Sequence, residues 1–207
     1  MLYRETILVG YSGHGLVVGE AAKLQGIDLK FYVNKTKVVF NPYNLKYLGF
    51  EASENFEFWD KEFNCILGIG DNTIRRQAAE LFLAKDKEIL NICHPKAAIS
   101  GYFEQGSGNY IAANVTVNPF ARIGDYCILN TGSIIEHDCV IGNSIHIAPG
   151  AVLAGGVKIG NNSFVGANAV IKEGIEVGEN VIIGAGAVVI RDVANNAKII
   201  GNPGREL

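Results

Sequence analysis

The sequence of 207 residues lacks the features that mark several large classes of protein. Basic residues form no cluster beyond the adjacent pair Arg75 and Arg76, and the formal net charge of -3 argues against a nucleic-acid-binding surface. No apolar run reaches membrane-spanning length, so we expect no membrane partner. The first ten residues lead directly into a strand-like segment, without the basic flank, apolar region and cleavage signal of an exported protein.

Cysteine is scarce as well, and Cys65, Cys93, Cys127 and Cys139 show no CxxC spacing. Neither a disulfide framework nor a zinc site is therefore predicted. We interpret the four as buried free thiols in a reducing environment and expect a cytoplasmic protein. The hydrophobic content of 48%, with ordinary charge, indicates a folded chain that is long enough for two small domains.

The second half of the chain carries a six-residue period. Every sixth residue is aliphatic at Ile111, Val117, Ile123, Leu129, Ile135, Ile141, Ile147, Leu153, Ile159, Val165, Ile171, Val177, Ile183 and Val189. A period of six fits neither one stripe of an α-helix nor a simple hairpin, and it favours short strands separated by turns at fixed intervals. Three hexads to a coil predict a triangular prism of stacked parallel strands with four to five coils, ending near Asn195 and Asn196.

Small residues and glycines also recur at fixed places in the period. A small residue stands four places after many of the aliphatic positions, at Ala121, Cys127, Ser133, Cys139, Ala151, Ser163, Ala169 and Ala187. Glycine often follows the aliphatic residue directly, at Gly124, Gly142, Gly160, Gly166, Gly178 and Gly184. We expect these places to have little room for a side chain and to include turns with unusual backbone angles.

The first 95 residues follow a different pattern, in which strands alternate with helices. Strand-like runs occupy residues 6–9, 31–33, 65–69 and 89–92, and helix-like spacing occupies residues 16–24, before Gly26, and a stretch capped by Thr73. This alternation predicts a small, Rossmann-like parallel βαβ sheet that binds ligands at the loops after its strand ends. Residues 36–62 are predicted to form either an excursion between strands or a partner-facing surface.

The loop GYSGHG after the first strand is a candidate phosphate cradle. Ser12, Gly13, His14 and Gly15 would offer backbone N–H groups at the start of a helix. The spacing G-x-x-G-x-G differs from the dinucleotide fingerprint, and Asn34 and Lys35 stand where an acidic residue would hold a ribose, so NAD binding is disfavoured. An alternative remains that the glycines merely close a strand-to-helix turn.

One coil interrupts the repeat with Glu136, His137 and Asp138, and His146 follows nine residues after the histidine. A histidine flanked by carboxylates is a candidate general base, because the acid partner fixes its tautomer and stabilises the imidazolium. Strand alternation would separate the three side chains, so we expect them at a corner of the prism. The alternatives are ordinary solvated turn residues or, as a lesser one, a metal site shared between chains. Either carboxylate could meet the imidazole.

Further motifs extend over essentially the whole chain. They are GYSGHG, LGIGDNTIRR at 67–76, HPKAAIS at 94–100, the hexads, LNTGSIIEHDCVIG at 129–142 and GNPGR at 201–205. Together they resemble the hexapeptide-repeat acyltransferases, specifically the bacterial nucleotide-sugar N-acetyltransferases and sialic-acid O-acetyltransferases of glycan synthesis. The resemblance implies an acceptor-binding α/β domain at 1–95 and, at 96–207, an all-β left-handed parallel β-helix with an acetyl-CoA groove. It also implies a homotrimer.

The resemblance assigns roles to individual residues. His137 would take a proton from the sugar 4-amino group as that group attacks the thioester, and Asp138 would raise the basicity of the histidine. The nucleotide-linked sugar would be bound by residues of the loops and of one turn: Ser12, Gly13, His14, Asn34, Lys35, Gly70 and Asn130. Acetyl-CoA would be bound by His146, Gly155, Ala167 and Ala185. No metal is implied.

The chain departs from the family pattern after its second strand. Relatives that use uridine nucleotides carry a pair of aspartates there, whereas this chain has Asn34 and Lys35, and lysine cannot accept a hydrogen bond from a base. The nucleotide contact is therefore expected to differ. A second departure is Gly204, where alanine is usual. Two other functions stay open from the sequence, namely sugar or sialic-acid O-acetylation and a trimeric sugar-binding scaffold without chemistry.

Overall fold

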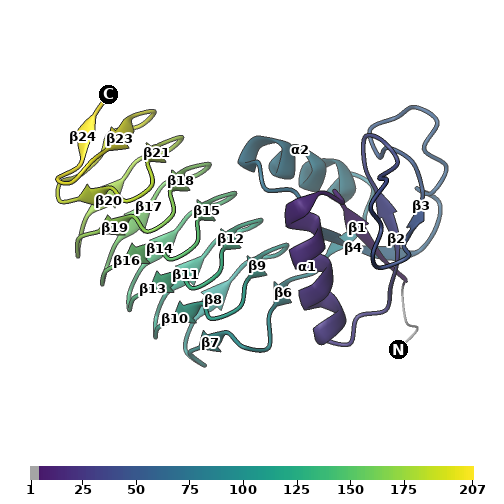
Figure 1. Cartoon of the computed structure of the whole chain (residues 1–207), viewed down its shortest axis with the longest axis horizontal. Helices are drawn as coiled ribbons and strands as arrows, with labels where there is room; N and C mark the ends of the chain where they lie inside the picture. The colour runs from purple at the N-terminus through teal and green to yellow at the C-terminus, as the bar shows by residue number, and fades with distance from the viewer. Residues whose placement is uncertain (1–4) are drawn as a thin grey trace. The chain divides into compact units, whose positions relative to one another are not determined.

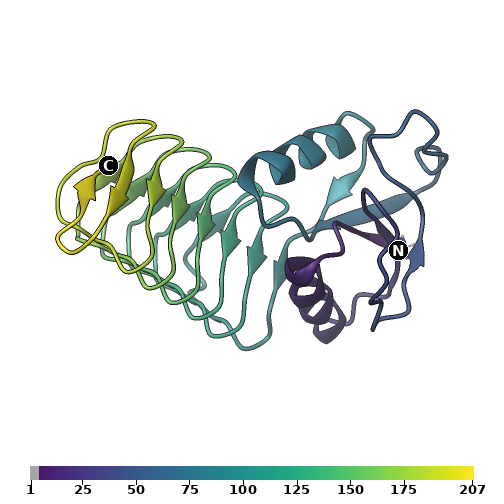
Figure 2. The same cartoon turned by 45° about the horizontal axis from the view of Figure 1, so that its top comes forward.

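The computed structural model describes residues 5–207, and the chain divides into two compact units between Pro95 and Lys96. The first four residues, on which the expected absence of an export signal also depends, lie outside the described residues. The first unit contains a parallel sheet with helices, and the second is a coiled stack of short strands (Figures 1 and 2).

The sheet of the first unit has the strand order β3-β2-β1-β4-β5, and all of its strands are parallel. Its elements are β1 (Glu5–Val9), α1 (Gly13–Leu24), β2 (Leu29–Val33), β3 (Lys46–Tyr47), β4 (Phe63–Leu67), α2 (Asn72–Leu83) and β5 (Glu88–Ile89). The neighbouring strands β1 and β4 each end in a continuous run of buried apolar residues, as expected of central strands in a parallel sheet. The predicted βαβ fold is confirmed.

Local details of the first unit differ from the predictions in three places. Helix α1 begins at Gly13 rather than Leu16, because the N–H of Leu16 already donates to Ser12 O. The cap of α2 is Asp71, whose carboxylate accepts from the N–H of Ile74 at 2.9 Å, and not Thr73. The run at 89–92 is not one strand, because β5 ends at Ile89 and a separate strand β6 (Ile92–Cys93) follows.

Residues 36–62 form an excursion between β2 and β4. It contributes the edge strand β3, which pairs in parallel with β2, and otherwise consists of turns and irregular segments. Its aromatic residues are anchored in the unit, since the ring centroids of Trp59 and Phe82 of α2 lie 5.1 Å apart. The excursion alternative is therefore confirmed.

The second unit is a parallel β-helix with three sheets, each named here after a strand near its middle. The β13 sheet contains β7 (Ala98–Ile99), β10 (Thr116–Val117), β13 (Ile134–Ile135), β16 (Val152–Leu153), β19 (Val170–Ile171) and β22 (Val188–Val189). The β14 sheet contains β8 (Glu104–Gln105), β11 (Arg122–Ile123), β14 (Val140–Ile141), β17 (Lys158–Ile159) and β20 (Glu176–Val177). Within residues 96–207, the β15 sheet contains β9 (Tyr110–Ile111), β12 (Ile128–Leu129), β15 (His146–Ile147), β18 (Phe164–Val165), β21 (Ile182–Ile183), β23 (Lys198–Ile200) and β24 (Arg205–Glu206), and β6 is its eighth strand.

From β7 to β22, paired strands of each sheet are 18 residues apart, so one coil consists of three hexads; the last coil is shorter, since Ile183 pairs with Ile199. Ile135 pairs with Leu153, Ile141 with Ile159, and Ile147 with Val165, always in parallel. Each of the fourteen aliphatic positions is at most 4% exposed, and the small residues four places later are buried with them. The predicted solenoid is confirmed, and its architecture is consistent with the left-handed coiling that the resemblance implies.

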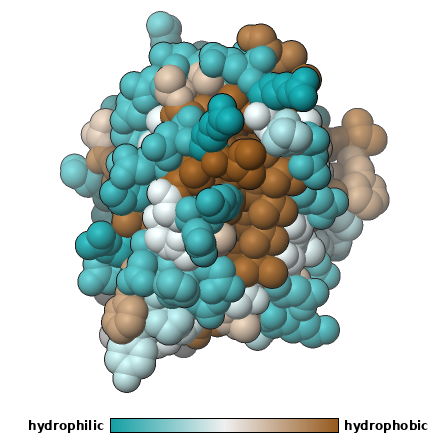
Figure 3. All heavy atoms as spheres, turned by 90° about the vertical axis from the view of Figure 1, so that its left-hand side faces the viewer, coloured by the Kyte–Doolittle hydropathy of each residue, from teal (hydrophilic) through white to brown (hydrophobic). Residues whose placement is uncertain are grey.

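The solenoid is longer than the four to five coils predicted, because the β13 sheet has six strands. It begins at Ala98, in a coil where Gln105 occupies an aliphatic position and pairs with Ile123. At the other end, β23 continues past the predicted limit and pairs with the antiparallel strand β24. This end of the unit exposes apolar side chains among hydrophilic ones (Figure 3), and the exposed apolar residues of the last coils include Ile182, Ile190 and Ile200.

The turns of the solenoid repeat one backbone feature without exception from Gly108 to Gly186. Every sixth residue has a positive φ, at Gly108, Asn114, Phe120, Tyr126, Gly132, Asp138, Ser144, Gly150, Gly156, Asn162, Asn168, Gly174, Asn180 and Gly186. This place comes three residues after the aliphatic position and favours glycine and asparagine, which tolerate a left-handed backbone. The glycines that follow the aliphatic residue directly have no such angle, so the expectation of unusual angles was wrong for them.

Those glycines are required because a side chain at their positions would collide with the backbone of the next coil. At Gly166 an ideal Cβ would lie 2.5 Å from Ala185 N and 2.6 Å from Gly184 C. Backbone atoms cannot move aside cheaply, because they are hydrogen-bonded between coils.

We predict that Gly166→Ala destabilises the second unit by about 1–3 kcal/mol through overpacking. Gly101→Ala is the matched control, because an ideal Cβ at Gly101 meets nothing within 4 Å. Urea unfolding followed by circular dichroism should show a lower midpoint for Gly166→Ala and a nearly unchanged one for Gly101→Ala. Equal midpoints for the two variants would contradict the packing explanation.

Candidate functional site

Several predicted acceptor residues follow the carboxyl ends of three adjacent strands in the first unit. Ser12 and Gly13 come after β1, Asn34 comes after β2, and Gly70 comes after β4. The loops after these strands are tied together by hydrogen bonds, since Gly10 N donates to Val33 O at 2.9 Å and Gly68 N donates to Val9 O at 2.7 Å. A ligand bound at this edge of the sheet would meet all three loops.

The glycines of the GYSGHG loop differ in whether the structure requires a residue without a side chain. Gly10 has φ +83°, and a Cβ at Gly15 would overlap Gly10 O, so both are needed for the tight passage from β1 into α1. This supports the purely structural alternative for these two positions. At Gly13, in contrast, an ideal Cβ meets nothing within 4 Å. Gly13 is the first residue of α1, and its N–H is among those that point out of the helix.

His14 and Gly70 lie together, as predicted. An ideal Cβ at Gly70 would be 3.8 Å from His14 Cβ. Burial, and then the charge of Arg75, lower the pKa of His14 to about 4. His14 is therefore a neutral imidazole at physiological pH.

Arg75 is a residue whose importance the sequence did not reveal. It is 1% exposed, and Nη1 donates to Ile69 O at 3.2 Å and to Gly70 O at 3.0 Å. Nη2 donates to Asn72 Oδ1 at 2.7 Å. The guanidinium thus fixes the loop between β4 and α2 and keeps a permanent positive charge beneath it. In the sequence, Arg75 is distinguished only by its basic neighbour Arg76.

Asn34 and Lys35 differ in how strongly they are held. The N–H of Asn34 donates to Gly49 O at 3.1 Å, and its Nδ2 donates to Thr36 O at 2.9 Å. Lys35 is exposed. The amide of Asn34 is therefore oriented by the backbone, with its nitrogen already engaged.

The polar triplet of the second unit lies in the turn between β13 and β14, at a corner of the prism as expected. His137 Nδ1 and Asp138 Oδ2 are 2.8 Å apart. Asp138 occupies the left-handed place of the turn, with φ +59°. Glu136 instead accepts a hydrogen bond from Asn118 Nδ2 at 2.8 Å. The carboxylate that meets the imidazole is therefore Asp138.

The hydrogen bond that His137 Nδ1–H donates to Asp138 raises the pKa of His137, and the negative charges of Asp138 and Glu136 act in the same direction. With the proton of the neutral ring held on Nδ1 by Asp138, Nε2 carries the lone pair that can accept a proton. The His137 side chain is 63% exposed, so a substrate can reach it. A histidine with one nitrogen held by a carboxylate and the other accessible is a candidate general base.

Gly155, one coil after His137, lies directly against the imidazole. An ideal Cβ at this position would be 2.6 Å from His137 Cε1 and 2.7 Å from Nε2. The two turns are also joined by a hydrogen bond from Gly156 N to His137 O, at 2.9 Å. Any side chain at residue 155 would displace the ring from its partner Asp138.

The other predicted site residues lie elsewhere on the prism. Asn130, in the turn between β12 and β13, has its Nδ2 at 3.1 Å from Nε2 of His146 on β15. Ala167 and Ala185 lie in stacked turns that follow β18 and β21, joined by the hydrogen bond from Gly186 N to Ala167 O. These four residues belong to the β15 sheet and the corner after it, whereas His137 and Gly155 share the corner after the β13 sheet.

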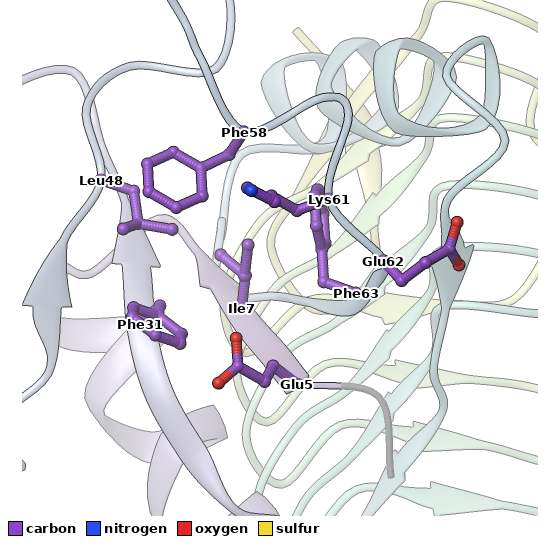
Figure 4. A pocket seen from close by; sticks show the side chains of 8 residues that line it. All are labelled: Glu5, Ile7, Phe31, Leu48, Phe58, Lys61, Glu62 and Phe63. Atoms are coloured by element: carbon purple, nitrogen blue, oxygen red, sulfur yellow. The ribbon is translucent and has the colours of Figure 1, made fainter. Parts of the chain in front are cut away.

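A separate cavity of about 240 Å³ lies in the first unit, toward the start of β1 and β4. Figure 4 shows Phe31, Leu48 and Phe58 around it, with the carboxylate of Glu5 at one side. The predicted acceptor loops follow the opposite ends of the same strands. None of the predicted site residues lines this cavity.

Residues 5–207 contain neither a disulfide nor a group of metal-ligating side chains. All four thiols are free, and Cys65, Cys127 and Cys139 are buried, but Cys93 is only half-buried. Within that range, no three His, Cys, Asp or Glu side chains are grouped as a metal site would require. The same residues include no helix that is both long and apolar enough to span a membrane.

Two family patterns match the chain. Residues 5–82 match the PglD N-terminal domain, and residues 120–155 and 156–191 match the bacterial transferase hexapeptide, six repeats. The curated protein GDP-perosamine N-acetyltransferase of Escherichia coli O157:H7 is 36% identical over 90 residues, which cover 44% of this chain. The match spans 40% of the length of that relative.

Solved structures match over nearly the whole chain. The acetyltransferase domain of PglB from Neisseria gonorrhoeae FA1090, in complex with acetyl coenzyme A, is 30% identical with a TM-score of 0.92, covering 99% of each chain. A perosamine N-acetyltransferase from Caulobacter crescentus, with one histidine mutated to asparagine and in complex with CoA and GDP-perosamine, is 29% identical with a TM-score of 0.92. That match covers 98% of this chain and 96% of the other.

We predict that His14 and His137 titrate on opposite sides of the ordinary histidine pKa of 6.5. NMR of the imidazole Cε1–H protons should show His14 titrating near pH 4 and His137 above 6.5. Because unfolded His14 binds its proton at a higher pH than folded His14, the free energy of unfolding should fall as the pH falls from about 6.5 to about 4. His14→Gln should flatten that part of the stability profile.

Asp138→Asn provides the matched change for the second histidine, since it removes the charge and keeps the shape. The pKa of His137 should fall, and that of His14 should not change. A His137 pKa that is the same in both proteins would show that Asp138 does not hold the imidazole in solution.

Proposed function

The chain belongs to the hexapeptide-repeat acetyltransferases with a PglD N-terminal domain, and on that premise we propose that it transfers acetyl from acetyl-CoA to the amine of a nucleotide-linked amino sugar. The observation that carries the proposal is the His137 imidazole, paired with Asp138 and resting on Gly155. The relatives described above are sugar N-acetyltransferases or acetyltransferase domains. The two solved structures are complexes with acetyl-CoA or with CoA and GDP-perosamine.

The reaction follows from the lone pair on Nε2 of His137. The sugar amine attacks the thioester carbonyl of acetyl-CoA, and a C–N bond forms. Nε2 of His137 takes the proton that the nitrogen must lose, and Asp138 stabilises the resulting imidazolium. The C–S bond then breaks, and the proton returns from His137 to the CoA thiolate. The products are an N-acetyl sugar and CoA, so the base is regenerated.

The first unit supports binding of the phosphates of a nucleotide sugar. The N-termini of α1 and α2 both follow strand ends at the same edge of the sheet, and helix N-termini favour anions. The buried guanidinium of Arg75 adds a fixed positive charge beneath the second loop. His14 stays neutral beside it and can donate one hydrogen bond without a charge of its own.

A guanine nucleotide is the carrier that we propose. Nδ2 of Asn34 donates to Thr36 O, which leaves Oδ1 as the group that can accept an N–H from a base. Two relatives are named for GDP-perosamine or bound to it. The uridine-type aspartate pair is missing from this chain.

The distribution of the other residues favours a site shared between copies of the chain. His137 and Gly155 lie at one corner, whereas Asn130, His146, Ala167 and Ala185 lie around another. The β13 sheet between these corners presents outward residues that are apolar, namely Ile134, Val152, Val170 and Val188. We propose a homotrimer in which the catalytic corner of one copy faces the second group of residues on its neighbour, with acetyl-CoA between them. The free thiols and these cytosolic substrates favour a cytoplasmic enzyme.

We predict that His137→Ala lowers kcat by about 10²–10⁴-fold, because it removes the general base. Acetyl-CoA binding, measured by calorimetry, should be retained. The assay combines acetyl-CoA with GDP-perosamine and follows the product by mass spectrometry, and an amide product should survive alkali that hydrolyses an ester. Unchanged turnover in His137→Ala would rule out the assigned base, and a wild-type protein that acetylates no amino sugar would rule out the function.

We predict that Gly155→Ala lowers kcat by about 10–100-fold, because a displaced imidazole is no longer aligned with the amine. The backbone at Gly155 does not have a positive φ, so alanine is compatible with its conformation. Gly101→Ala serves again as the control, with open space at its Cβ. If the two variants have the same kcat, Gly155 does not support the catalytic ring.

A further inference from the structure

Phe120 is an unusual residue for the left-handed place of a solenoid turn. It occupies the left-handed place with φ +65°, where a bulky side chain is strained, and it is 62% exposed. The same place is asparagine or glycine in ten of the fourteen turns, and Tyr126, the other aromatic residue there, is half-buried. The strained backbone of Phe120 is not offset by burial of its side chain, and an uncompensated strain of this kind points to a function.

The position of Phe120 connects it with the catalytic corner. It stands one coil before Asp138, whose N–H donates to Pro119 O at 3.2 Å. Phe120 N in turn donates to the carbonyl of Tyr102, at 2.8 Å. Tyr102 is 74% exposed, and the two ring centroids are 6.1 Å apart. An exposed aromatic pair therefore lies on the upstream side of the catalytic turn.

The downstream side of the same corner is different. The next coil places Gly155 and Gly156 there, and the coil after it has the exposed residues Lys172, Glu173 and Gly174. The imidazole thus stands between a glycine surface and an aromatic one. The two substrates of an acetyl transfer must approach one base from different directions, and this corner offers two unlike surfaces for them.

A cavity of about 250 Å³ opens beside the aromatic pair. Its lining residues are Tyr102, Glu104, Phe120, Ala121, Arg122 and Asp138. It is smaller than the roughly 300–1,000 Å³ of sites that hold drug-sized ligands, so it fits one sugar ring and not a whole nucleotide sugar. Aromatic faces with a few charged groups match a pyranose, which has apolar C–H faces and a rim of hydroxyl groups.

We propose that Tyr102 and Phe120 form the subsite for the acceptor sugar ring, with the ring stacked on Phe120 and its amine directed at His137. This inference rests on the proposed function and adds the residues that select the sugar. Asp138 then has two roles, since it accepts the hydrogen bond from the imidazole and also lines the sugar cavity. Glu104 and Arg122 provide acceptors and donors for sugar hydroxyls.

The test replaces Phe120 with asparagine, the residue that the chain itself uses at Asn114, Asn162, Asn168 and Asn180. Because asparagine suits the left-handed backbone, Phe120→Asn should fold with an unchanged or higher Tm. The KM for GDP-perosamine should rise about three- to ten-fold, while the KM for acetyl-CoA and the mass of the oligomer stay the same. Tyr126→Asn, the same change at another corner, should leave both KM values unchanged.

Saturation-transfer NMR with GDP-perosamine separates this inference from the proposed function. In the wild-type protein, the sugar-ring and guanine protons should both receive magnetisation, and in Phe120→Asn the sugar signal should weaken relative to the guanine signal. A wild-type protein that binds GDP-perosamine but does not acetylate it would fail the proposed function only. Unaltered sugar signals, no sugar signal in the wild type, a higher KM for acetyl-CoA, or a smaller oligomer would each overturn the subsite.

Discussion

The structure of the second unit depends on one constraint, which is that every turn must be made in the same few residues. Each hexad contains a left-handed residue three places after its aliphatic position, and this repeats from Gly108 to Gly186 without a gap. Identical turns keep the strands in register, so residues 18 apart stack on each other. The catalytic geometry is a result of that stacking, because Asp138 fills a left-handed place and Gly155 falls under His137. A rigid stack holds these groups without needing a dedicated loop.

Much of this could be predicted from the sequence, because a strict period leaves few alternatives. The aliphatic residues, the small inward residues and the corner position of His137 all followed from counting in sixes. The physical reason for each glycine could not be predicted from the sequence, in which nothing distinguishes Gly166 from Gly156. The first is excluded from having a side chain by the next coil, and the second has a positive φ. Only the structure distinguishes a glycine required by steric crowding from one required by its backbone angle.

The candidate site shows the same limit. The sequence placed His137, the candidate base, between two carboxylates but could not choose between Glu136 and Asp138, because the choice depends on where a turn directs each side chain. The role of Arg75 could not be predicted for a related reason. Its guanidinium donates to the backbone oxygens of Ile69 and Gly70, and a backbone acceptor leaves no signal in the sequence. Phe120 was hidden because its strain is a property of φ. Residues that break a local rule are those to which a function can be assigned.

The central claim is that the Asp138-paired imidazole of His137 removes the proton from the acceptor amine. The most direct measurement is the pH dependence of kcat/KM for wild type and Asp138→Asn, under identical conditions and with the same amino-sugar acceptor. Activity needs the neutral ring, so it falls on the acid side as His137 becomes protonated, and Asp138 raises the pKa at which this happens. The account predicts that the acid limb moves to lower pH in Asp138→Asn, in step with the pKa of His137 measured by NMR. An acid limb that stays in place while the His137 pKa falls would contradict it.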